Sequence, residues 1–172
     1  MISRDIPCLG IEPTHDTAEV ARSKGIDTIE AFFGYSFSEK IEKADLIIAN
    51  NVLAHVPDIN DFIAGIANLL KPSGQVSIEF PHLLQLIKDN LFDTIYHEHY
   101  SYLSLGFVER LSKSVGLDVI NVECISTHGG SLRVWLAHQD EYNIDTSVER
   151  LLAEENAFGL NNLKTYTNFQ QR

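Results

Sequence analysis

A nearly continuous apolar run from Ala44 to Ala49 decides the fold class of this chain of 172 residues. Apolar side chains at successive rather than alternate positions indicate a strand buried on both faces, as in a parallel sheet. A helix is predicted from about Asp58 to Leu70 because its apolar residues share one face, and a turn at 71–74 leads into a strand from Gln75 to Phe80. Strand, helix and strand in this order predict an α/β domain with a mostly parallel sheet.

The segments on either side continue the alternation. Before the run, the predicted elements are a strand at 7–12, a helix at 14–24 and a strand at 26–30. After a polar, irregular stretch, the predicted elements are a helix at 109–115 and closing strands at 117–124 and 131–137. Beyond Asp145, apolar residues recur near helical spacing, which predicts a long helix without a stop signal before Arg172. We therefore expect one domain over 1–142 and a helix over 143–172 that leads to a further domain.

Charge and composition exclude several classes of protein. The formal net charge is −11, whereas binding a nucleic acid polymer requires clustered Lys and Arg. No apolar run approaches the roughly 20 residues of a membrane span, and the N-terminus lacks a signal-peptide pattern. The two cysteines, Cys8 and Cys124, are too far apart in sequence to suggest a disulfide scaffold or a zinc site. We expect a cytoplasmic protein without membrane or nucleic acid partners.

Polar side chains gather where the predicted strands end. In open α/β sheets, ligands bind outside the carboxyl ends of the strands, so these residues are candidates for binding. They are Glu12, Asn50, Asn51, His55, Glu79 and His82. The alternatives are a solvated acid at Glu12, a simple turn of the chain at the two asparagines, a helix-start role for His55 and a strand-ending turn at Pro81.

The run from Tyr96 to Tyr102 is the densest group of titratable side chains in the chain. Acid–base catalysis is the favoured interpretation, because histidine titrates near neutral pH and tyrosine or glutamate can orient it. In a helix Tyr96 and His99 would share a face, whereas in an extended segment His97 and His99 would. The second geometry leaves open a metal site, with His82, His128 or Glu79 as the third ligand, and a packing role is the other alternative.

A glycine-bearing turn, Thr127 to Arg133, combines an imidazole, hydroxyl groups and a guanidinium group. Its backbone N–H groups and Arg133 could hold a phosphate or pyrophosphate. The alternative is a plain hairpin turn with Arg133 in solvent. The turn lacks the lysine of a P-loop, which argues against nucleotide hydrolysis.

Five segments in this order carry a resemblance to a known family: GIEP at 10–13, ADLIIANNVLAHVPDI at 44–59, EFPHLLQLI at 79–87, FDTIYHEHYSYLS at 92–104 and THGGSLRV at 127–134. Together they resemble the central domain of S-adenosylmethionine-dependent C-methyltransferases, which methylate a ring carbon of a nucleotide-linked keto-deoxysugar. The resemblance extends from about Leu9 to Ala137 and implies a Rossmann-like class I methyltransferase sheet, with residues 1–142 as part of that domain.

The resemblance also implies roles for individual residues. Glu12 would hold the ribose of S-adenosylmethionine, and Asn50 and Asn51 would line the methyl-transfer site. His99 would be the base that removes a proton from the carbon next to the sugar ketone, with Tyr96 and Glu98 orienting it or stabilising the enolate and His55 across the sugar. The substrate side would be formed by Glu79, His82, His128, Gly129, Gly130, Ser131 and Arg133. No metal is implied for this chain.

The chain departs from the family pattern in three places. The family has an N-terminal zinc module with clustered cysteines, a first strand with a glycine-rich cofactor loop, and a C-terminal domain, none of which is seen here. The first strand lies between the strands that end at Glu12 and Ala49 in that family, so both would lack a shared partner. We expect the chain alone to bind S-adenosylmethionine poorly and to be inactive or prone to aggregate. The alternatives are a non-catalytic ligand-binding or interaction domain, or a nucleotide-sugar dehydrogenase or epimerase, although neither a dinucleotide glycine fingerprint nor a Tyr-x-x-x-Lys pair is present.

Overall fold

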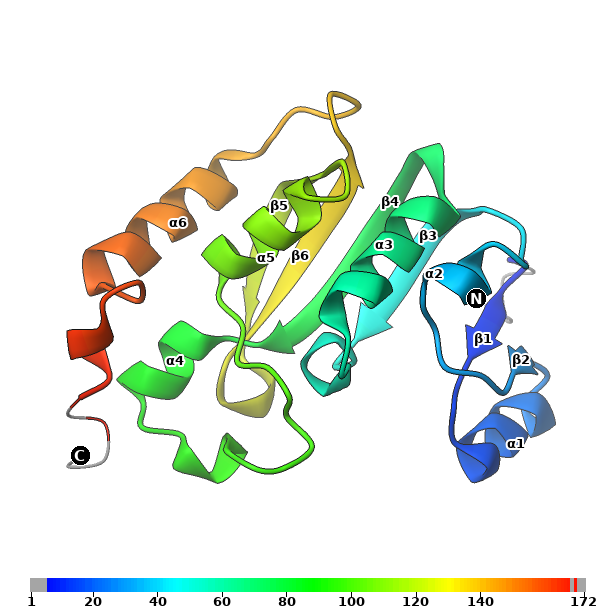
Figure 1. Ribbon diagram of the computed structural model, residues 1–172, viewed down its shortest axis with the longest axis horizontal. Coiled ribbons are helices and arrows are strands. Elements are labelled where there is room, and N and C mark those ends of the chain that lie inside the picture. Colours follow the sequence, from blue (N-terminus) through cyan, green and yellow to red (C-terminus); the bar gives the residue numbers. More distant parts are fainter. Residues whose placement is uncertain (1–5, 168, 170–172) are drawn as a thin grey trace.

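The core of the molecule is a four-stranded sheet in the order β3-β4-β6-β5, seen in a computed structural model that describes residues 6–167 and 169 (Figure 1). The strands are β3 (Ala44–Asn50), β4 (Leu70–Pro81), β5 (Leu117–Ile125) and β6 (Ser131–His138). β3 and β4 are parallel, and β6 runs antiparallel to both β4 and β5. The sheet is therefore mixed rather than mostly parallel, because β6 returns directly from β5 through a tight turn and inserts between β4 and β5.

Helices cover one face of this sheet and enclose the apolar core. They are α2 (Tyr35–Ser38), α3 (Ile59–Leu69), α5 (Leu105–Lys113) and α6 (Thr146–Phe158). The transverse row Ala49, Ile78, Val134 and Val122 is buried beneath them, one residue from each strand. Burial of such a row on several neighbouring strands is the main source of stability for a domain of this size.

The other face of the sheet carries side chains of the opposite parity. On β3 these include Leu46 and Ile48, which are 44% and 49% exposed. Ile48 pairs with Ser77 and Ser77 with Trp135, so these three side chains share that face. β3 therefore presents a half-exposed apolar surface, although its sequence predicted burial on both faces.

A separate two-stranded sheet stands beside β3. It consists of β1 (Leu9–Ile11) and β2 (Asp27–Ile29), which are parallel and joined by α1 (His15–Ser23). Within the part of the chain that the structure describes, neither β1 nor β3 has a second strand partner. The sequence predicted this arrangement, with two strands that lack the partner expected between them.

Three expected boundaries were wrong, of which the simplest is the start of α5, at Leu105 rather than residue 109. The C-terminal helix was predicted to continue toward Arg172, but α6 ends at Phe158 because Gly159 adopts a left-handed conformation (φ 86°) and its N–H bonds back to Glu155 and Asn156. A short helical turn, η5 (Leu163–Thr165), follows. The predicted turn at 71–74 is instead an irregular part of β4, since the pairing with β3 shifts from Ala44–Leu70 to Leu46–Gln75.

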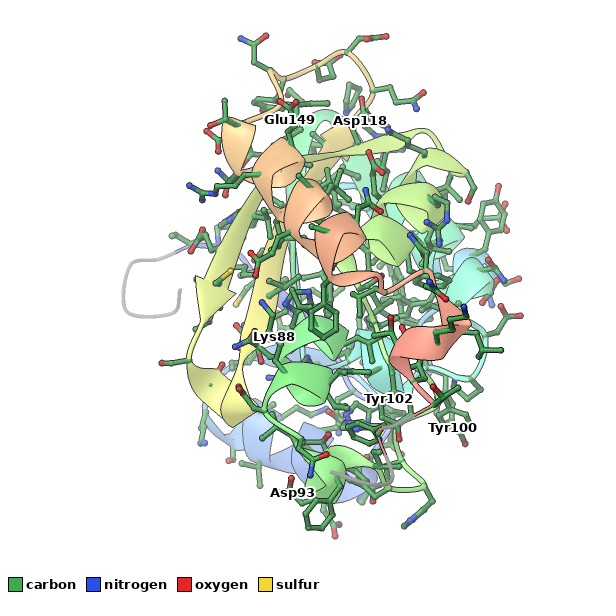
Figure 2. All side chains as sticks on the ribbon, turned by 90° about the vertical axis from the view of Figure 1, so that its left-hand side faces the viewer. Lys88, Asp93, Tyr100, Tyr102, Asp118 and Glu149 are labelled. Atoms are coloured by element: carbon green, nitrogen blue, oxygen red, sulfur yellow. The ribbon has the colours of Figure 1, made fainter. Side chains whose placement is uncertain are left out.

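The remaining short elements lie at the carboxyl ends of the strands. They are η2 (Leu53–His55), α4 (Leu83–Lys88), η3 (Phe92–Thr94) and η4 (Thr127–Gly129). In Figure 2, Asp93, Tyr100 and Tyr102 lie at the lower end of the molecule, with Asp118 and Glu149 at the opposite end. The segment with the titratable run therefore occupies the rim at which ligands bind in open α/β sheets.

Candidate active site

His99 is held by hydrogen bonds at both ring nitrogens. Its Nδ1 lies 2.8 Å from the carbonyl oxygen of Thr94, at the end of η3, and its Nε2 lies 3.0 Å from the hydroxyl oxygen of Tyr96. A carbonyl oxygen can only accept, so in the neutral ring Nδ1 carries the proton and Nε2 presents a lone pair. The Tyr96 hydroxyl donates to that lone pair. This is the tautomer that a general base requires.

The ring of His55 packs against the ring of His99. Its ring centroid is 4.8 Å from that of His99 in an edge-to-face arrangement. The backbone holds the two segments together, because the N–H groups of Tyr100 and Ser101 both donate to the carbonyl oxygen of Ala54, at 2.9 and 3.2 Å. Partial burial and the neighbouring His99 lower the pKa of His55 below its ordinary value, while the charge of Glu98 opposes this.

Of the other residues in the run, Tyr102 contacts His99 and Glu98 does not hydrogen-bond to it. Glu98 is exposed and makes no side-chain hydrogen bond within the described residues. The carbonyl group of Thr94 occupies the orienting position that was expected for Glu98 or Tyr96. Tyr102, which we did not single out, has its ring centroid 6.0 Å from that of His99 in an edge-to-face contact. A main-chain acceptor has no residue-type signal, so the sequence could not have identified Thr94.

The predicted cofactor residues follow β1 and β3. Glu12 is partly exposed, and its Oε1 accepts the N–H of Thr14 at 2.8 Å, which leaves Oε2 for another donor. Asn50 ends β3, and Asn51 adopts a left-handed backbone (φ 55°) as its N–H donates to the carbonyl oxygen of Glu79 at 2.7 Å. Asparagine tolerates this conformation better than most residues, so Asn51 has a local reason to stand at this turn.

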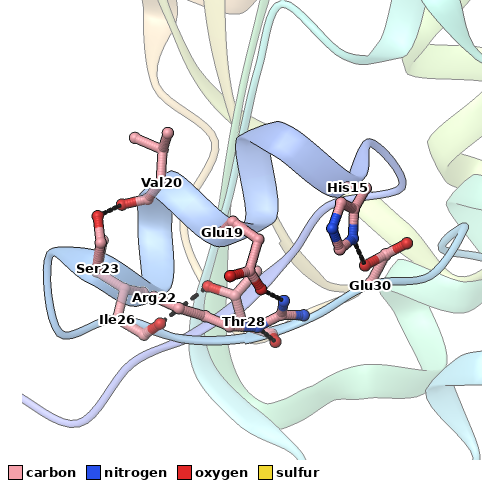
Figure 3. A network of polar contacts seen from close by, with 8 residues as sticks. All are labelled: His15, Glu19, Val20, Arg22, Ser23, Ile26, Thr28 and Glu30. Atoms are coloured by element: carbon pink, nitrogen blue, oxygen red, sulfur yellow. Dashed lines mark hydrogen bonds and ion pairs between the residues drawn. The ribbon is translucent and has the colours of Figure 1, made fainter.

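A polar network connects α1, which begins three residues after Glu12, with β2 (Figure 3). His15 Nδ1 lies 2.8 Å from Glu30, and this hydrogen bond and the carboxylate charge raise the pKa of His15. Arg22 pairs with Glu19 and donates to the carbonyl oxygen of Thr28 at 3.0 Å. These bonds attach α1 to β2 and fix the segment that begins at Glu12.

Arg133 is engaged by two carboxylates. Its guanidinium group lies 3.2 Å from Glu79 and 3.5 Å from Glu123, its cross-strand neighbours on β4 and β5. The buried Glu79 also accepts a hydrogen bond from the Thr127 hydroxyl at 3.2 Å. Arg133 therefore joins strands in this structure, and its predicted contact with a phosphate group would require it to leave or share these partners.

The other predicted substrate residues surround a cavity of about 500 Å³ between α4, α6 and the β5–β6 turn. Among its lining residues are His82, Gly129, Gly130 and Ser131. His99, Tyr96 and His55 do not line it, so the predicted residues fall into two groups. The His82 side chain is only 3% exposed and is bound by Glu155. The side chain of His128 lies outside the described part of the structure.

Neither a metal cluster nor a membrane helix is found in the described residues. Over 6–167 and 169, no three His, Cys, Asp or Glu side chains are grouped to hold a metal ion. Over the same residues, every helix is too short or too polar to cross a bilayer.

Comparisons with known proteins relate the chain to methyltransferases. A family profile described as a methyltransferase domain matches residues 4–122, and one described as a C-methyltransferase C-terminal domain matches residues 126–172. The chain is 38% identical over 166 residues to the C-methyltransferase NovU of Streptomyces niveus, covering 94% of this chain. It spans 40% of the length of that relative.

Solved structures show the same fold at lower identity. The PH0226 protein of Pyrococcus horikoshii superposes with a TM-score of 0.61 at 16% identity, over 80% of this chain and 74% of that one. The magnesium protoporphyrin IX methyltransferase of Synechocystis, solved with bound S-adenosylhomocysteine, gives 0.59 at 14% identity, over 76% and 64%. The predicted Rossmann-like class I methyltransferase fold is confirmed. The chain therefore belongs to the family defined by this methyltransferase domain, which matches residues 4–122, and its residues 126–172 match the C-methyltransferase C-terminal domain.

Proposed function

We propose that these residues transfer a methyl group from S-adenosylmethionine to the carbon next to the ketone of a nucleotide-linked deoxysugar, with His99 as the base. The observation that carries the proposal is the hydrogen-bonded series Thr94, His99, Tyr96 beside His55. It leaves one imidazole lone pair directed toward a tyrosine hydroxyl at the ligand-binding rim of the sheet.

The side chains can be assigned to the steps of this reaction. A ketone acidifies its neighbouring carbon, and His99 Nε2 would accept that proton when the sugar displaces the Tyr96 hydroxyl from it. The Tyr96 hydroxyl, which now lies 3.0 Å from Nε2 of His99, would then be free to donate to the enolate oxygen. His55, kept neutral by its lowered pKa, would add no charge that opposes protonation of His99. Glu98 would stabilise the imidazolium that forms.

The described residues fit part of an S-adenosylmethionine site. Glu12 has one carboxylate oxygen available for a ribose hydroxyl, and Asn50 and Asn51 stand at the end of β3, one turn of chain before His55. When bound, S-adenosylmethionine supplies an electrophilic methyl group for the carbanion. The two asparagines would hold the methyl-bearing end of the cofactor near the sugar.

The test separates proton removal from methyl transfer. Two preparations are compared: this chain, and a chimaera in which it replaces the matching segment of the S. niveus relative. The readouts are transfer of a labelled methyl group to nucleotide-linked keto-deoxysugars, and exchange of the proton next to the ketone in D₂O without cofactor. His99→Ala should abolish both while cofactor binding is kept, and Tyr96→Phe should reduce both by about 10²-fold, typical of a lost acid–base contribution.

Two results would contradict the proposal. Unchanged exchange and turnover in His99→Ala would remove His99 from the role of base. A folded, cofactor-binding chimaera that methylates none of the keto-deoxysugars would contradict the substrate class.

A further inference from the structure

Glu155 is a buried carboxylate on the inner face of α6, only 4% exposed. Burial of a charged group is costly unless strong hydrogen bonds compensate it. The neighbouring inward-facing residues of α6, Val148 and Leu151, are apolar and belong to the core. An apolar residue at 155 would continue that face, so the buried carboxylate must be stabilised by polar partners.

Three donors converge on this carboxylate. Oε1 accepts the N–H of Leu105 at 2.6 Å and lies 2.7 Å from His82 Nε2, and Oε2 accepts the N–H of Gly106 at 2.9 Å. Leu105 and Gly106 open α5, where backbone N–H groups have no partner within the helix and the helix dipole favours a negative charge. Since both carboxylate oxygens accept, His82 donates through Nε2.

His82 lies at a junction of three segments. Its own N–H donates to the carbonyl oxygen of Gly130 at 3.1 Å, and the N–H of Leu83 donates to that of Leu103 at 2.9 Å. Leu103 follows Tyr102, the last residue of the titratable run, and forms an isolated bridge with His82. The end of the run is therefore bound on one side by the His82–Leu83 segment and on the other by Glu155, through Leu105.

A second backbone attachment of the run, within the described residues, is formed by the bonds from Tyr100 and Ser101 to Ala54. Tyr102 lies between the two attachments and its ring contacts that of His99, while His99 and Tyr96 precede the bonds to Ala54. At the end of the run, His82 and Glu155 are 73 residues apart in sequence. Glu155 lies in the segment that matches the C-terminal domain, whereas His82 and Leu105 lie in the methyltransferase domain.

We propose that Glu155 and His82 are positioning residues that hold the segment 96–105 so that His99 and Tyr96 stay aligned with His55. Glu155 acts through the first two N–H groups of α5 and through His82, and it touches neither cofactor nor substrate. The importance of Glu155 and His82 for catalysis rests on the proposed function, whereas their positioning of segment 96–105 is independent of it. Through Glu155, α6 couples the C-terminal segment to the geometry of the active site.

The test is amide hydrogen exchange by NMR, with the chain free of cofactor and substrate. In Glu155→Gln the side chain keeps its size but loses one acceptor oxygen. We expect the amides of Tyr100 and Ser101 to exchange at least about 10-fold faster, while those of Val134 and Leu136 in β6 keep their rates. The 15N shifts of His99 should also move away from the values of a pure Nδ1–H tautomer.

The matched control is Glu154→Gln, which removes the same charge from the adjacent residue of α6. Among the described residues Glu154 hydrogen-bonds to Lys88, at 2.6 Å on the surface, and not to α5, so this variant should leave Tyr100, Ser101 and His99 unchanged. A second pair uses His82: His82→Leu removes the donor to Glu155 and should reproduce the effect, whereas His82→Gln keeps a donor and should restore slow exchange.

Each remaining outcome would overturn the proposal. If Glu155→Gln and His82→Leu leave exchange at Tyr100 and Ser101 as in the control, the pair does not position the run. If they accelerate Val134 and Leu136 equally, or if either fails to fold, the pair serves global stability only. Absence of methyl transfer in the chimaera and in all its variants would contradict the proposed function and not this inference, because exchange is measured without turnover.

Discussion

At the scale of single residues, one main-chain oxygen atom determines the tautomer of neutral His99. The carbonyl oxygen of Thr94 fixes the Nδ1–H tautomer, and the Tyr96 hydroxyl marks the position that a substrate proton would occupy. Because the acceptor is a main-chain carbonyl oxygen, the ring of His99 is oriented through Nδ1 by a neutral group rather than by a carboxylate. His99 thus has its Nδ1 fixed by the backbone and its Nε2 directed toward the Tyr96 hydroxyl, as a general base at this rim requires.

The same neighbourhood predicts an unusual titration of His55. Burial and His99 lower its pKa and Glu98 raises it, so in NMR titration His55 should titrate below its ordinary value of 6.5, and lower still in Glu98→Gln. A folded pKa below the unfolded one means that the unfolded chain binds more protons in that window. The contribution of His55 to the free energy of unfolding should therefore fall as pH drops from 6.5 toward the folded pKa, while His15, whose pKa is raised, contributes in the opposite direction. Glu141→Gln, on the surface, is the control, and titration of His55 at or above 6.5 would contradict the prediction.

At the scale of elements, the predictable parts were those with strong local signals. The strand at 44–49 and the apolar face of α3 formed as expected, and the strand predicted from Gln75 to Phe80 formed as part of the longer β4, which begins at Leu70. The end of α6 was missed because apolar residues at 163, 166 and 169 continue a helical period past Gly159, and a glycine inside such a pattern was not taken as a cap. The residues around His99 were predicted as a group, but Thr94 acts through its backbone and Glu155 through a fold-level contact, neither of which has a pattern in the sequence.

The start of α3 gives a test at this scale. The side chain of Asp58 accepts the N–H of Asp61 at 3.0 Å and so satisfies one unpaired donor at the helix start. Asp58→Ala should lower the free energy of unfolding by about 1 kcal/mol, as measured by urea denaturation. Asp58→Asn, which keeps an accepting oxygen, should cost much less. Equal losses in the two variants would indicate that charge, and not the cap, is responsible.

The β5–β6 turn gives a second test. Gly130 has φ 120°, and a Cβ there would lie 2.7 Å from Cγ of Gln85 on α4. Gly25 also has a positive φ, 79°, but has no neighbour within 4 Å of such an atom. Gly25→Ala should cost about 1–2 kcal/mol from backbone strain alone, and Gly130→Ala clearly more. Adding Gln85→Ala should recover part of the difference, and failure to recover any of it would show that crowding against α4 is not the cause.

At the scale of the whole molecule, the notable feature is the break in the sheet between β1 and β3. Each presents an edge that has no second strand partner within the described residues. On β3 this edge coincides with the half-exposed Leu46 and Ile48. Unpaired N–H and C=O groups beside exposed apolar side chains are the combination through which sheets associate with other chains.

We therefore expect the chain to self-associate in a concentration-dependent way, through the edge of β3. Ile48→Lys and Leu46→Lys place a charge on that strand and should shift the sedimentation coefficient toward the monomer. Leu163→Lys is the matched control, because Leu163 is 79% exposed but lies in η5, away from both free edges. The net charge of −11 becomes −10 in all three variants, so repulsion between whole molecules changes equally. A monomeric unmodified chain at about 100 μM, or equal dissociation by Leu163→Lys, would show that the β3 edge does not drive association.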